Sequence, residues 1–459
     1  MLVDAATMAR FACRTTLSDV PPDVAQTGRL LLLDTLGALV GGLQYPQVQA
    51  LARAVRSVEP DGPEDAPFGR LLTLGTAATW LDADSGGSFH PQGHRLLPVP
   101  TAHPAPHSLP VLLHAAAAGD LTDERLLELF VLANELGLRF GVGTSLRPGL
   151  HPHGIHGPVA AAVAAALVAG LDEDATAHAL LLGASLPLAA TLQVPVRGGT
   201  VRNAWTGLGC FIGAQAAGRA RDGAHGDAAV VAELFGSAVC TDLDAEELSG
   251  GLGSRWRLPD SYLKPYACAR WIHPALDAWR NALRRSGVDI AEAARHVDGI
   301  DVETFAFAAA LGAREVTSDM HARFSLPTCL AVLALDGELV AGSFLPNRLR
   351  RPGVGELAAR VHVREEPAFS AALPRERPTR VTVRWRDGGS TSAEVRNARG
   401  NPDDPLSRDE VEQKFLRNVD GVVGAGLARD VLASVLDADP AGPRSLAALA
   451  RALVGTWCP

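Results

Sequence analysis

The chain has few aromatic residues and no surplus of positive charge. Aromatic side chains make up 5% of its 459 residues, while long stretches are rich in Ala, Leu, Gly and Val. That composition favours closely packed helices over sheets of aromatic-rich strands. The formal net charge is −9, which makes nucleic acids and anionic membranes poor partners, so we predict that neither binds.

Closely spaced cysteine pairs and long apolar runs are also missing. The six cysteines are scattered without a Cys-x-x-Cys pair, so we expect reduced, mostly buried thiols rather than disulfides or a cysteine zinc site. The most apolar segments fall short of the roughly 18 residues that suggest a membrane span, which predicts buried core helices. The N-terminal residues show no export signal, so we expect a cytoplasmic protein.

The order of sequence patterns predicts a mainly α protein in three consecutive parts. Apolar residues repeat at helical spacing over residues 1–267, strand-like alternation enters within residues 268–398, and helical spacing returns over residues 399–459. Asp387-Gly388 between two alternating runs is a hairpin signal. We therefore predict a large all-helical domain formed by both chain ends, with a smaller α+β domain inserted between them.

Local signals place several helix ends. Thr122 is suited to an N-terminal cap, and Ser407 with Glu410 forms a capping-box pattern. Pro158 suits the first turn of a helix, so we expect a helix to begin at Gly157-Pro158. The dipole of that helix would favour a bound carboxylate at its N-terminus.

Histidines are concentrated in two segments. Eight of the fourteen lie between residues 90 and 156, namely His90, His94, His103, His107, His114, His151, His153 and His156. One explanation is a proton-transfer site, because histidine titrates near neutrality and serves as acid or base. A second is a metal site of His151 and His153 with Asp82 or His103, although no metalloprotease or calcium-loop motif supports it. Solvated polar loops are the third, and the pattern alone leaves all three open.

Two further segments bring cations into apolar surroundings. "GGTVRNAWTG" carries Arg202 on a glycine-flanked turn before an apolar helix. "SYLKPYACARWIHPALDAW" carries Lys264, Arg270 and His273 among aromatic and small residues. Single cations on apolar segments often lie along the surface or form structural pairs. Taken together, the four predict a pocket for a small polyanion.

These segments, in this order, resemble the MmgE/PrpD family, which includes 2-methylcitrate dehydratase, cis-aconitate decarboxylase and iminodisuccinate epimerase. The resemblance runs from residue 31 to residue 415, and its specificity lies in the ordered combination of individually weak segments. The matching segments are "LLLDTLGALVGG", "TAATWLDADSGG", "HPAPHSLPVLLHAAAAGD", "GLHPHGIHGPVAAAVAAALVAGLDEDA", "GGTVRNAWTG", "YLKPYACARWIHPALDA", "FSLPTCLAVLALDG" and "DPLSRDEVEQKF".

The resemblance implies a homodimer whose active site lies between the helical domain and an α+β lid domain and needs neither a metal nor another cofactor. The family's histidine–proline pattern falls on His151, which leaves His153 and His156 in supporting roles. The residues implied as catalytic are His103, His151, Asp82 and Lys264. The residues predicted to bind substrate are Arg202, His273, Asp84 and Arg270.

Two departures from the family bear on the reaction. Arg202 stands where the cis-aconitate decarboxylase type has a second active-site lysine, and Leu326 stands where that type has a tyrosine. Arginine binds carboxylates well but is a poor proton donor. We therefore predict a lyase that forms a carbanion beside a carboxylate of a small di- or tricarboxylate, with a hydro-lyase as the leading assignment. The alternatives are an epimerase of a small dicarboxylate, a cis-aconitate-type decarboxylase, and an inactive carboxylate-binding protein.

Overall fold

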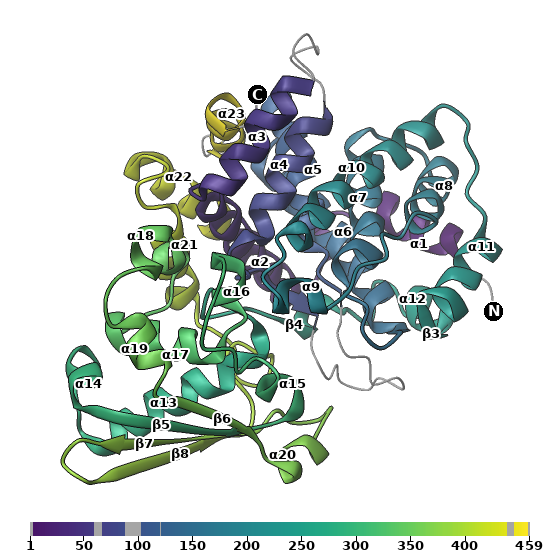
Figure 1. The fold of residues 1–459 in the computed structure, drawn as a ribbon. Helices are drawn as coiled ribbons and strands as arrows, with labels where there is room; N and C mark the ends of the chain where they lie inside the picture. Colours follow the sequence, from purple (N-terminus) through teal and green to yellow (C-terminus); the bar gives the residue numbers. More distant parts are fainter. Residues whose placement is uncertain (1–2, 59–66, 88–101, 120, 438–444, 458–459) are drawn as a thin grey trace.

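A computed structural model describes residues 3–58, 67–87, 102–119, 121–437 and 445–457. Figure 1 shows a large helical part and a smaller α+β part attached along one side of it. The prediction of a mainly α protein is confirmed. Among the described helices, none combines the length and apolar character that crossing a bilayer requires. The five described cysteines are free, as expected.

The helical part is a bundle in which α10 packs against α4, α7 and α8. Thr122 and Asp172 cap α6 and α8 through their side-chain oxygens, as the sequence predicts for Thr122. The α-helices of this part are α1 (Ala5–Arg14), α2 (Pro22–Gly42), α3 (Pro46–Val58), α4 (Pro67–Trp80), α5 (Ala105–Ala118), α6 (Asp123–Val142), α7 (His153–Val168), α8 (Glu173–Ala184), α9 (Gln193–Val196), α10 (Val201–Arg221), α11 (Ala228–Glu233) and α12 (Ala245–Ser249). Short single turns are η1 (Leu17–Asp19), η2 (Leu234–Ala238) and η3 (Leu258–Asp260).

Helix α7 begins earlier than the sequence predicts. It starts at His153, so Pro158 lies inside the helix and the expectation of a start at Gly157-Pro158 is wrong. A proline cannot donate to the carbonyl four residues before it. The carbonyl of Gly154 instead accepts a hydrogen bond from the backbone N–H of Leu188, at 2.8 Å. The helix therefore tolerates this proline, and its N-terminus lies in the His151–His153 segment.

The helical part also contains two short two-stranded sheets, so the expectation that it is all-helical is wrong in detail. Strand β2 (Thr144–Leu146) pairs with β3 (Cys240–Leu243), and β1 (Gly86–Gly87) pairs antiparallel with β4 (Ser261–Tyr262). A Cβ on Gly86 would lie 2.7 Å from the Tyr262 hydroxyl, so only glycine allows this approach. The β1–β4 pair joins segments that are far apart in sequence, and it positions the site described below.

The α+β part contains a four-stranded sheet in the order β6-β5-β7-β8. Strands β5 and β6 are parallel, whereas β5–β7 and β7–β8 are antiparallel, with the predicted hairpin turning at Asp387-Gly388. Helix α13 packs on β7 and β8, and α17 packs on β6. The strands are β5 (Val297–Thr304), β6 (Val361–Glu365), β7 (Thr379–Trp385) and β8 (Ser390–Val395). The helices and single turns are η4 (Arg270–Ile272), α13 (His273–Ser286), α14 (Ile290–His296), α15 (Ala306–Ala309), α16 (Asp319–Arg323), α17 (Leu326–Asp336), η5 (Ala341–Phe344), α18 (Pro346–Leu349), α19 (Val354–Ala358) and α20 (Pro367–Ala371).

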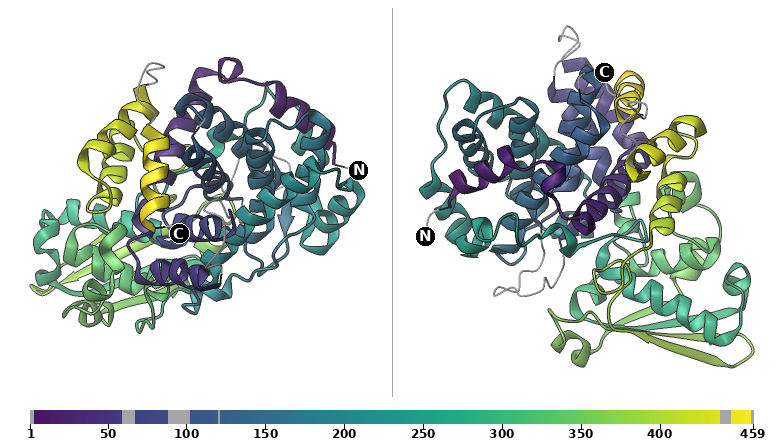
Figure 2. Two further views of the ribbon diagram at one scale, coloured as in Figure 1. Left: turned by 90° about the horizontal axis from the view of Figure 1, so that it is seen from above. Right: turned by 180° about the vertical axis from the view of Figure 1, so that it is seen from behind.

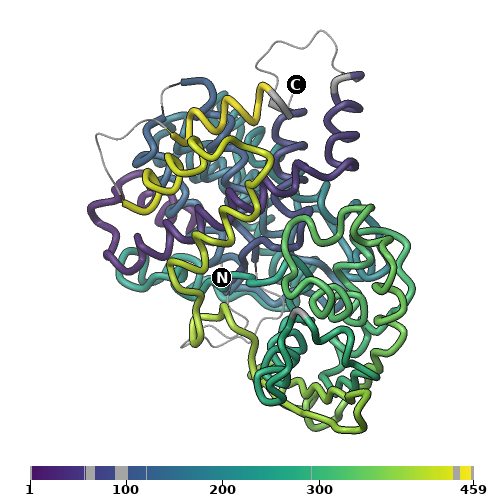
Figure 3. Tube along the Cα trace, turned by 90° about the vertical axis from the view of Figure 1, so that its left-hand side faces the viewer, coloured from purple at the N-terminus to yellow at the C-terminus, as the bar shows by residue number. Residues whose placement is uncertain are grey.

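The chain then returns to the helical part through α21 (Arg408–Val419), α22 (Ala425–Asp437) and α23 (Ser445–Trp457). Helices α21 and α22 pack against α2, and α23 packs against α5. Figures 2 and 3 show these yellow helices beside the purple N-terminal helices. The predicted capping box at Ser407 and Glu410 is present at the start of α21. Both ends of the chain thus build one helical body, while the predicted domain limits at residues 267 and 398 stay predictions.

Candidate active site

Two buried aspartates follow α4 in a tight loop. The backbone of Asp82 has a φ of +49°, a left-handed conformation that aspartate adopts more readily than most residues. Asp82 is 2% exposed, and Asp84 is fully buried. Because an isolated buried carboxylate is strongly disfavoured, both side chains require cationic or hydrogen-bonding neighbours.

Lys264 and Arg202 supply those cations from distant parts of the chain. Lys264 Nζ lies 2.7 Å from Asp82 Oδ1, and Arg202 Nη2 lies 2.8 Å from the same oxygen. The same two groups lie 3.9 Å and 3.8 Å from Asp84 Oδ1. Arg202 is in the first turn of α10 rather than on the predicted turn before the helix, and Lys264 lies two residues after the end of β4. The β1–β4 pair therefore brings the lysine to the aspartates.

The charges of this cluster support one another. Burial alone raises the pKa of each carboxyl, but Lys264 and Arg202 outweigh it, so the pKa values of Asp82 and Asp84 lie below the usual value. Burial likewise lowers the pKa of Lys264, yet the two carboxylates outweigh burial and raise it. Both aspartates are thus held ionised, and the lysine is held as a cation.

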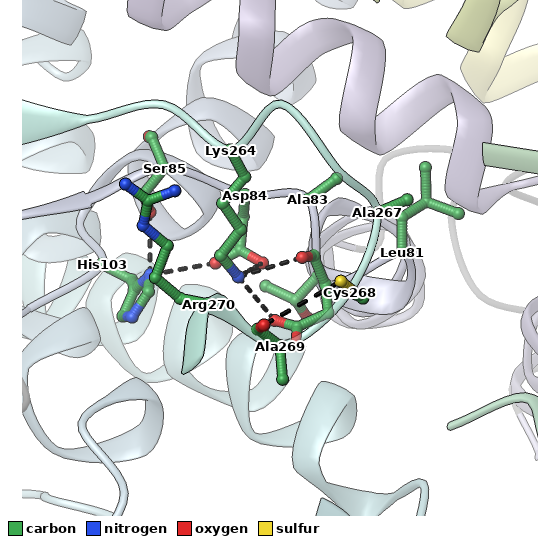
Figure 4. Close-up of polar contacts among 12 residues, drawn as sticks. Leu81, Ala83, Asp84, Ser85, His103, Lys264, Ala267, Cys268, Ala269 and Arg270 are labelled. Atoms are coloured by element: carbon green, nitrogen blue, oxygen red, sulfur yellow. Dashed lines mark hydrogen bonds and ion pairs between the residues drawn. The ribbon is translucent and has the colours of Figure 1, made fainter. Parts of the chain in front are cut away.

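His103 is paired with Asp84. Its Nδ1 lies 2.8 Å from the carbonyl oxygen of Ser85 and 3.0 Å from Asp84 Oδ2, contacts drawn as dashed lines in Figure 4. Both neighbours are acceptors, so we assign the proton of the neutral ring to Nδ1. This leaves Nε2 to accept a proton, and the adjacent carboxylate stabilises the resulting imidazolium.

Three histidine rings form a stack, with His153 in the middle. Its ring centroid lies 4.3 Å from that of His103 and 4.9 Å from that of His151. Nε2 of His153 is 3.0 Å from Arg202 Nη2, which has only protons to offer, so this nitrogen is the acceptor. Burial, followed by the charge of Arg202, lowers the pKa of both His151 and His153 well below the usual value. The middle ring is therefore neutral, as suits a supporting residue.

Other histidines of the two segments have structural contacts. His107 Nδ1 lies 2.8 Å from the carbonyl of His103, and its ring fits where Gly157 and Gly209 lack a side chain. His156 Nε2 lies 2.9 Å from the Thr144 hydroxyl. Burial lowers the pKa of His107 to about 4 and that of His156 to about 3. His90 and His94 lie outside the described residues.

A cavity of about 80 Å³ lies beside this cluster. Six of the eight predicted site residues line it, namely Asp82, His103, His151, Arg202, Lys264 and Arg270. Asp84 lies behind His103, where it orients the ring, which differs from its predicted contact with substrate. A larger cleft of about 1160 Å³ between α13 and α21 has mixed charges and does not include the His103–Asp84 pair. We therefore place the site at the smaller cavity.

His273 supports Arg270 instead of lining the cavity as predicted. Its Nε2 lies 3.1 Å from the carbonyl of Cys268, and its Nδ1 accepts from Arg270 Nη1 at 3.0 Å. Arg270 also donates to the carbonyls of Ala398 and Arg399 and to the side-chain oxygen of Asn401. All four of these acceptors are uncharged, so the contacts fix the position of Arg270 without neutralising its charge.

Sequence reasoning did not single out two residues that line the cavity. The Tyr262 ring meets His103 edge-on and carries the Arg270 guanidinium 5.1 Å from its centroid. Arg377, which precedes β7, reaches the cavity from the α+β part. Burial and then the charge of Arg270 lower the pKa of Arg377 to about 9. Tyr262 lies two residues before the predicted Lys264, a usable signal, whereas nothing near Arg377 in the sequence indicates its role.

A metal ion fits this cluster poorly. Asp84, His103 and His153 offer ligand atoms within 4.8 Å of one another. The Nε2 lone pair of His153, however, is already directed at an Arg202 N–H. Two cations also lie within 4 Å of Asp84 Oδ1, where they would repel a divalent ion. The arrangement suits an anion instead, because Arg202, Lys264, Arg270 and Arg377 outnumber the two aspartates.

Comparison with known proteins identifies the family of the chain. Residues 6–246 match the MmgE/PrpD N-terminal domain, and residues 266–438 match the MmgE/PrpD C-terminal domain. Cis-aconitate decarboxylase of Aspergillus terreus is 22% identical over 467 residues, which covers 94% of this chain and 92% of the relative. Cis-aconitate decarboxylase-like protein oryM of Aspergillus oryzae is 25% identical over 453 residues, which covers 91% of each chain. The similarity to these decarboxylases supports a lyase. The chain therefore belongs to the MmgE/PrpD family.

Proposed function

We propose that this protein is a lyase that acts without a cofactor on a small di- or tricarboxylate, through a carbanion beside one of the carboxylates. The observation that carries the proposal is the His103–Asp84 pair, whose imidazole lines the same cavity as Lys264 and Arg202. A proton-transfer group and fixed cations are the two elements that such chemistry requires.

His103 is the group that moves the proton in this proposal. With Nδ1 held by Ser85 and Asp84, Nε2 takes a proton from the carbon next to a substrate carboxylate, or returns one to it. A single well-placed acid or base contributes about 10²–10⁴ in rate. His151, which also lines the cavity, is kept neutral by burial and by Arg202, and is the second candidate.

The cations stabilise the charge that develops on the substrate. Asp82 and Asp84 hold Lys264 protonated, so it acts as a fixed positive charge and not as a base. Arg270 keeps its charge available because the acceptors described above are neutral. Fixed charges on buried side chains such as Lys264 and Arg202 act more strongly than they do in solution. The carbanion is thereby spread onto a carboxylate that faces these cations.

Dehydration is our leading assignment, and decarboxylation is the second. In dehydration the carbanion expels a hydroxyl group, which leaves as water after taking a proton. In decarboxylation the bond to a carboxylate breaks, carbon dioxide leaves, and the remaining electron pair takes a proton. The names of the two relatives favour decarboxylation. Arg202 favours dehydration, because dehydration can return the proton taken from carbon to the leaving hydroxyl, whereas decarboxylation consumes a proton that a permanent cation bound to Asp82 does not supply.

The experiment is incubation of the protein with a panel of hydroxylated and unsaturated di- and tricarboxylates in deuterated water, followed by proton NMR. A new alkene signal, or addition of water to an alkene, supports a hydro-lyase. Release of carbon dioxide with one deuterium added to the product assigns a decarboxylase, and deuterium exchange without net change assigns an epimerase. Binding without turnover or exchange across the panel would contradict the lyase proposal and favour an inactive carboxylate-binding protein. The same panel with Lys264→Met is the control for contaminating activity.

The cavity sets a condition for substrate entry. Its volume of about 80 Å³ is below the roughly 300–1,000 Å³ of typical ligand pockets. We therefore propose that the α+β part, which contributes Arg377, moves outward to admit the substrate.

The homodimer and the cytoplasmic location stay predictions. Light scattering that gives the mass of a single chain would contradict the homodimer.

A further inference from the structure

The loop that carries the two aspartates is held along its backbone by side chains from the whole length of the protein. Five carbonyl oxygens between residues 79 and 85, which span the end of α4 and the loop, lie within 3.0 Å of a side-chain nitrogen. These contacts are Thr79 with Arg202 at 2.7 Å, Leu81 with Arg323 at 2.9 Å, Asp82 with Lys264 at 3.0 Å, Ala83 with Lys414 at 3.0 Å and Ser85 with His103 at 2.8 Å. Figure 4 shows the loop with two of these partners, His103 and Lys264.

Lys414 is the member of this set that comes from the C-terminal helices. It lies on α21, and its Nζ donates to the Ala83 carbonyl at 3.0 Å and to Asp34 Oδ1 of α2 at 2.6 Å. Asp34 is fully buried, and the Lys414 side chain is 9% exposed. A lysine–aspartate pair this deep has a large desolvation cost, so stability alone is a weak reason to have one. Its direct contact with the loop offers another reason.

We propose that Lys414 is a positioning residue, which together with Asp34 holds the Ala83 carbonyl and so fixes Asp82 and Asp84 on either side of it. The kinetic part of this inference rests on the proposed function, because it is there that Asp84 orients His103. The structural part, which is the immobilisation of the loop, is independent of the reaction.

The geometry explains why this carbonyl needs a partner. The left-handed backbone of Asp82 has a conformational cost that neighbouring contacts must offset. The Ala83 peptide separates Asp82, which binds Lys264 and Arg202, from Asp84, which binds His103. A rotation of that peptide would turn both carboxylates away from their partners. Misplacing a reacting group by about 1 Å can cost about 100-fold in rate.

The Lys414–Asp34 pair also interacts electrostatically with charged residues of the site. Burial raises the pKa of Asp34, and Lys414 opposes that effect, while Asp84 and Lys264 act on the same carboxyl from the loop. The pair adds no net charge beside the two site aspartates. Replacing Lys414 alone would leave a buried carboxylate near Asp84, so the variant would confuse positioning with unfolding.

The decisive variant therefore changes both partners, as Lys414→Met with Asp34→Asn. It removes both charges at similar volume, which avoids an unpaired buried ion, but it also removes the donor to the Ala83 carbonyl. The control is Arg257→Met with Glu247→Gln, which removes another buried ion pair with Nε–Oε1 at 2.7 Å, together with the contacts of Arg257 with Asp260 and of Glu247 with Arg255. Neither control residue is among the partners of the loop carbonyls given above.

We expect the Lys414/Asp34 double variant to melt close to the native protein but to lose roughly 10–100-fold in kcat, with a much smaller change in KM. Its peptide spanning residues 79–87 should exchange backbone hydrogens faster in mass spectrometry. The Arg257/Glu247 variant should keep both kcat and the slow exchange of that peptide. Lys414→Ala leaves Asp34 unpaired, so it serves for chemical rescue alone. Small alkylammonium ions should restore part of its kcat, because the cleft of about 1160 Å³ is lined in part by Lys414 and gives them access.

The outcomes separate this inference from the proposed function. Native kcat and native exchange of the 79–87 peptide in a well-folded double variant would overturn the inference. Equal loss of kcat in the double variant and its control would also overturn it, since the effect would then be general destabilisation. If the native protein turns over none of the panel, the proposed function fails. The exchange experiment then still decides whether Lys414 holds the loop.

Discussion

Replacing His103 by asparagine and, separately, His153 by asparagine tests which ring of the stack moves protons. The amide nitrogen of an asparagine at position 103 can take the place of Nδ1 beside Ser85 and Asp84. That variant therefore keeps the local hydrogen bond but loses Nε2. At position 153 the shorter side chain cannot reach Arg202, which now lies 3.0 Å from the Nε2 of His153.

The two substitutions should differ in both rate and stability. Loss of a general acid or base in His103→Asn should lower kcat by about 10²–10⁴ and change the melting temperature little. His153→Asn leaves a buried Arg202 N–H without its acceptor, which should cost about 1–3 kcal/mol of stability. If the loosened Arg202 forfeits about 1 kcal/mol of transition-state stabilisation, kcat falls only about fivefold.

Initial rates on the best substrate of the panel measure the first effect, and thermal unfolding followed by circular dichroism measures the second. Near-equal kcat values in two well-folded variants would refute the assignment of His103. A collapse of activity in His153→Asn alone would move the proton-transfer role to the middle of the stack.

Three further predictions follow from the same cluster. Arg202→Lys should lose contact with either Thr79 or Asp82, each a charged hydrogen bond worth about 1.5–3 kcal/mol, so kcat/KM should fall roughly 10–100-fold. Lys264→Met should lower kcat/KM further. Near-native kinetics in both variants would show that the cations are misassigned. Dialysis against a strong chelator should leave turnover unchanged, and a loss that zinc or iron specifically restores would contradict the metal-free site. Because the pKa of His107 falls from 6.5 unfolded to about 4 folded, the unfolded chain binds more protons between these values, and stability should fall as the pH drops below about 6.5. His107 alone should account for about 2 kcal/mol of this loss by pH 5, and a His107→Asn variant with an unreduced slope in urea unfolding would contradict the assignment.

Much of the fold follows from local signals in the sequence. The caps at Thr122 and Ser407 and the hairpin at Asp387-Gly388 form as predicted, because each depends on a few neighbouring residues. The start of α7 could not be predicted in this way. Pro158 is compatible with the helix only because Leu188, thirty residues later, supplies the hydrogen bond to Gly154.

Local sequence signals predict even less of the site than of the fold. The sequence patterns indicate Asp82, His103 and Lys264, but not that the lysine and the first aspartate form an ion pair across 182 positions. They also do not show that His273 supports Arg270 from behind. These relations depend on the pairing of β1 with β4 and on the packing of α13, which are tertiary features. The sequence indicates which residue types belong to the site, whereas the contacts between them can be known only from the fold.

The contact of Lys414 with the aspartate loop has a consequence for how the protein matures. Synthesis proceeds from the N-terminus, and early segments can fold before later ones emerge. The aspartate loop and α2 leave the ribosome more than 300 residues before Lys414, given the separation of 331 positions between Ala83 and Lys414. A nascent chain thus holds Asp34 without its lysine and the Ala83 carbonyl without its donor. The site is complete only when α21 docks, so its assembly waits for a helix that is made more than 300 residues after the aspartates.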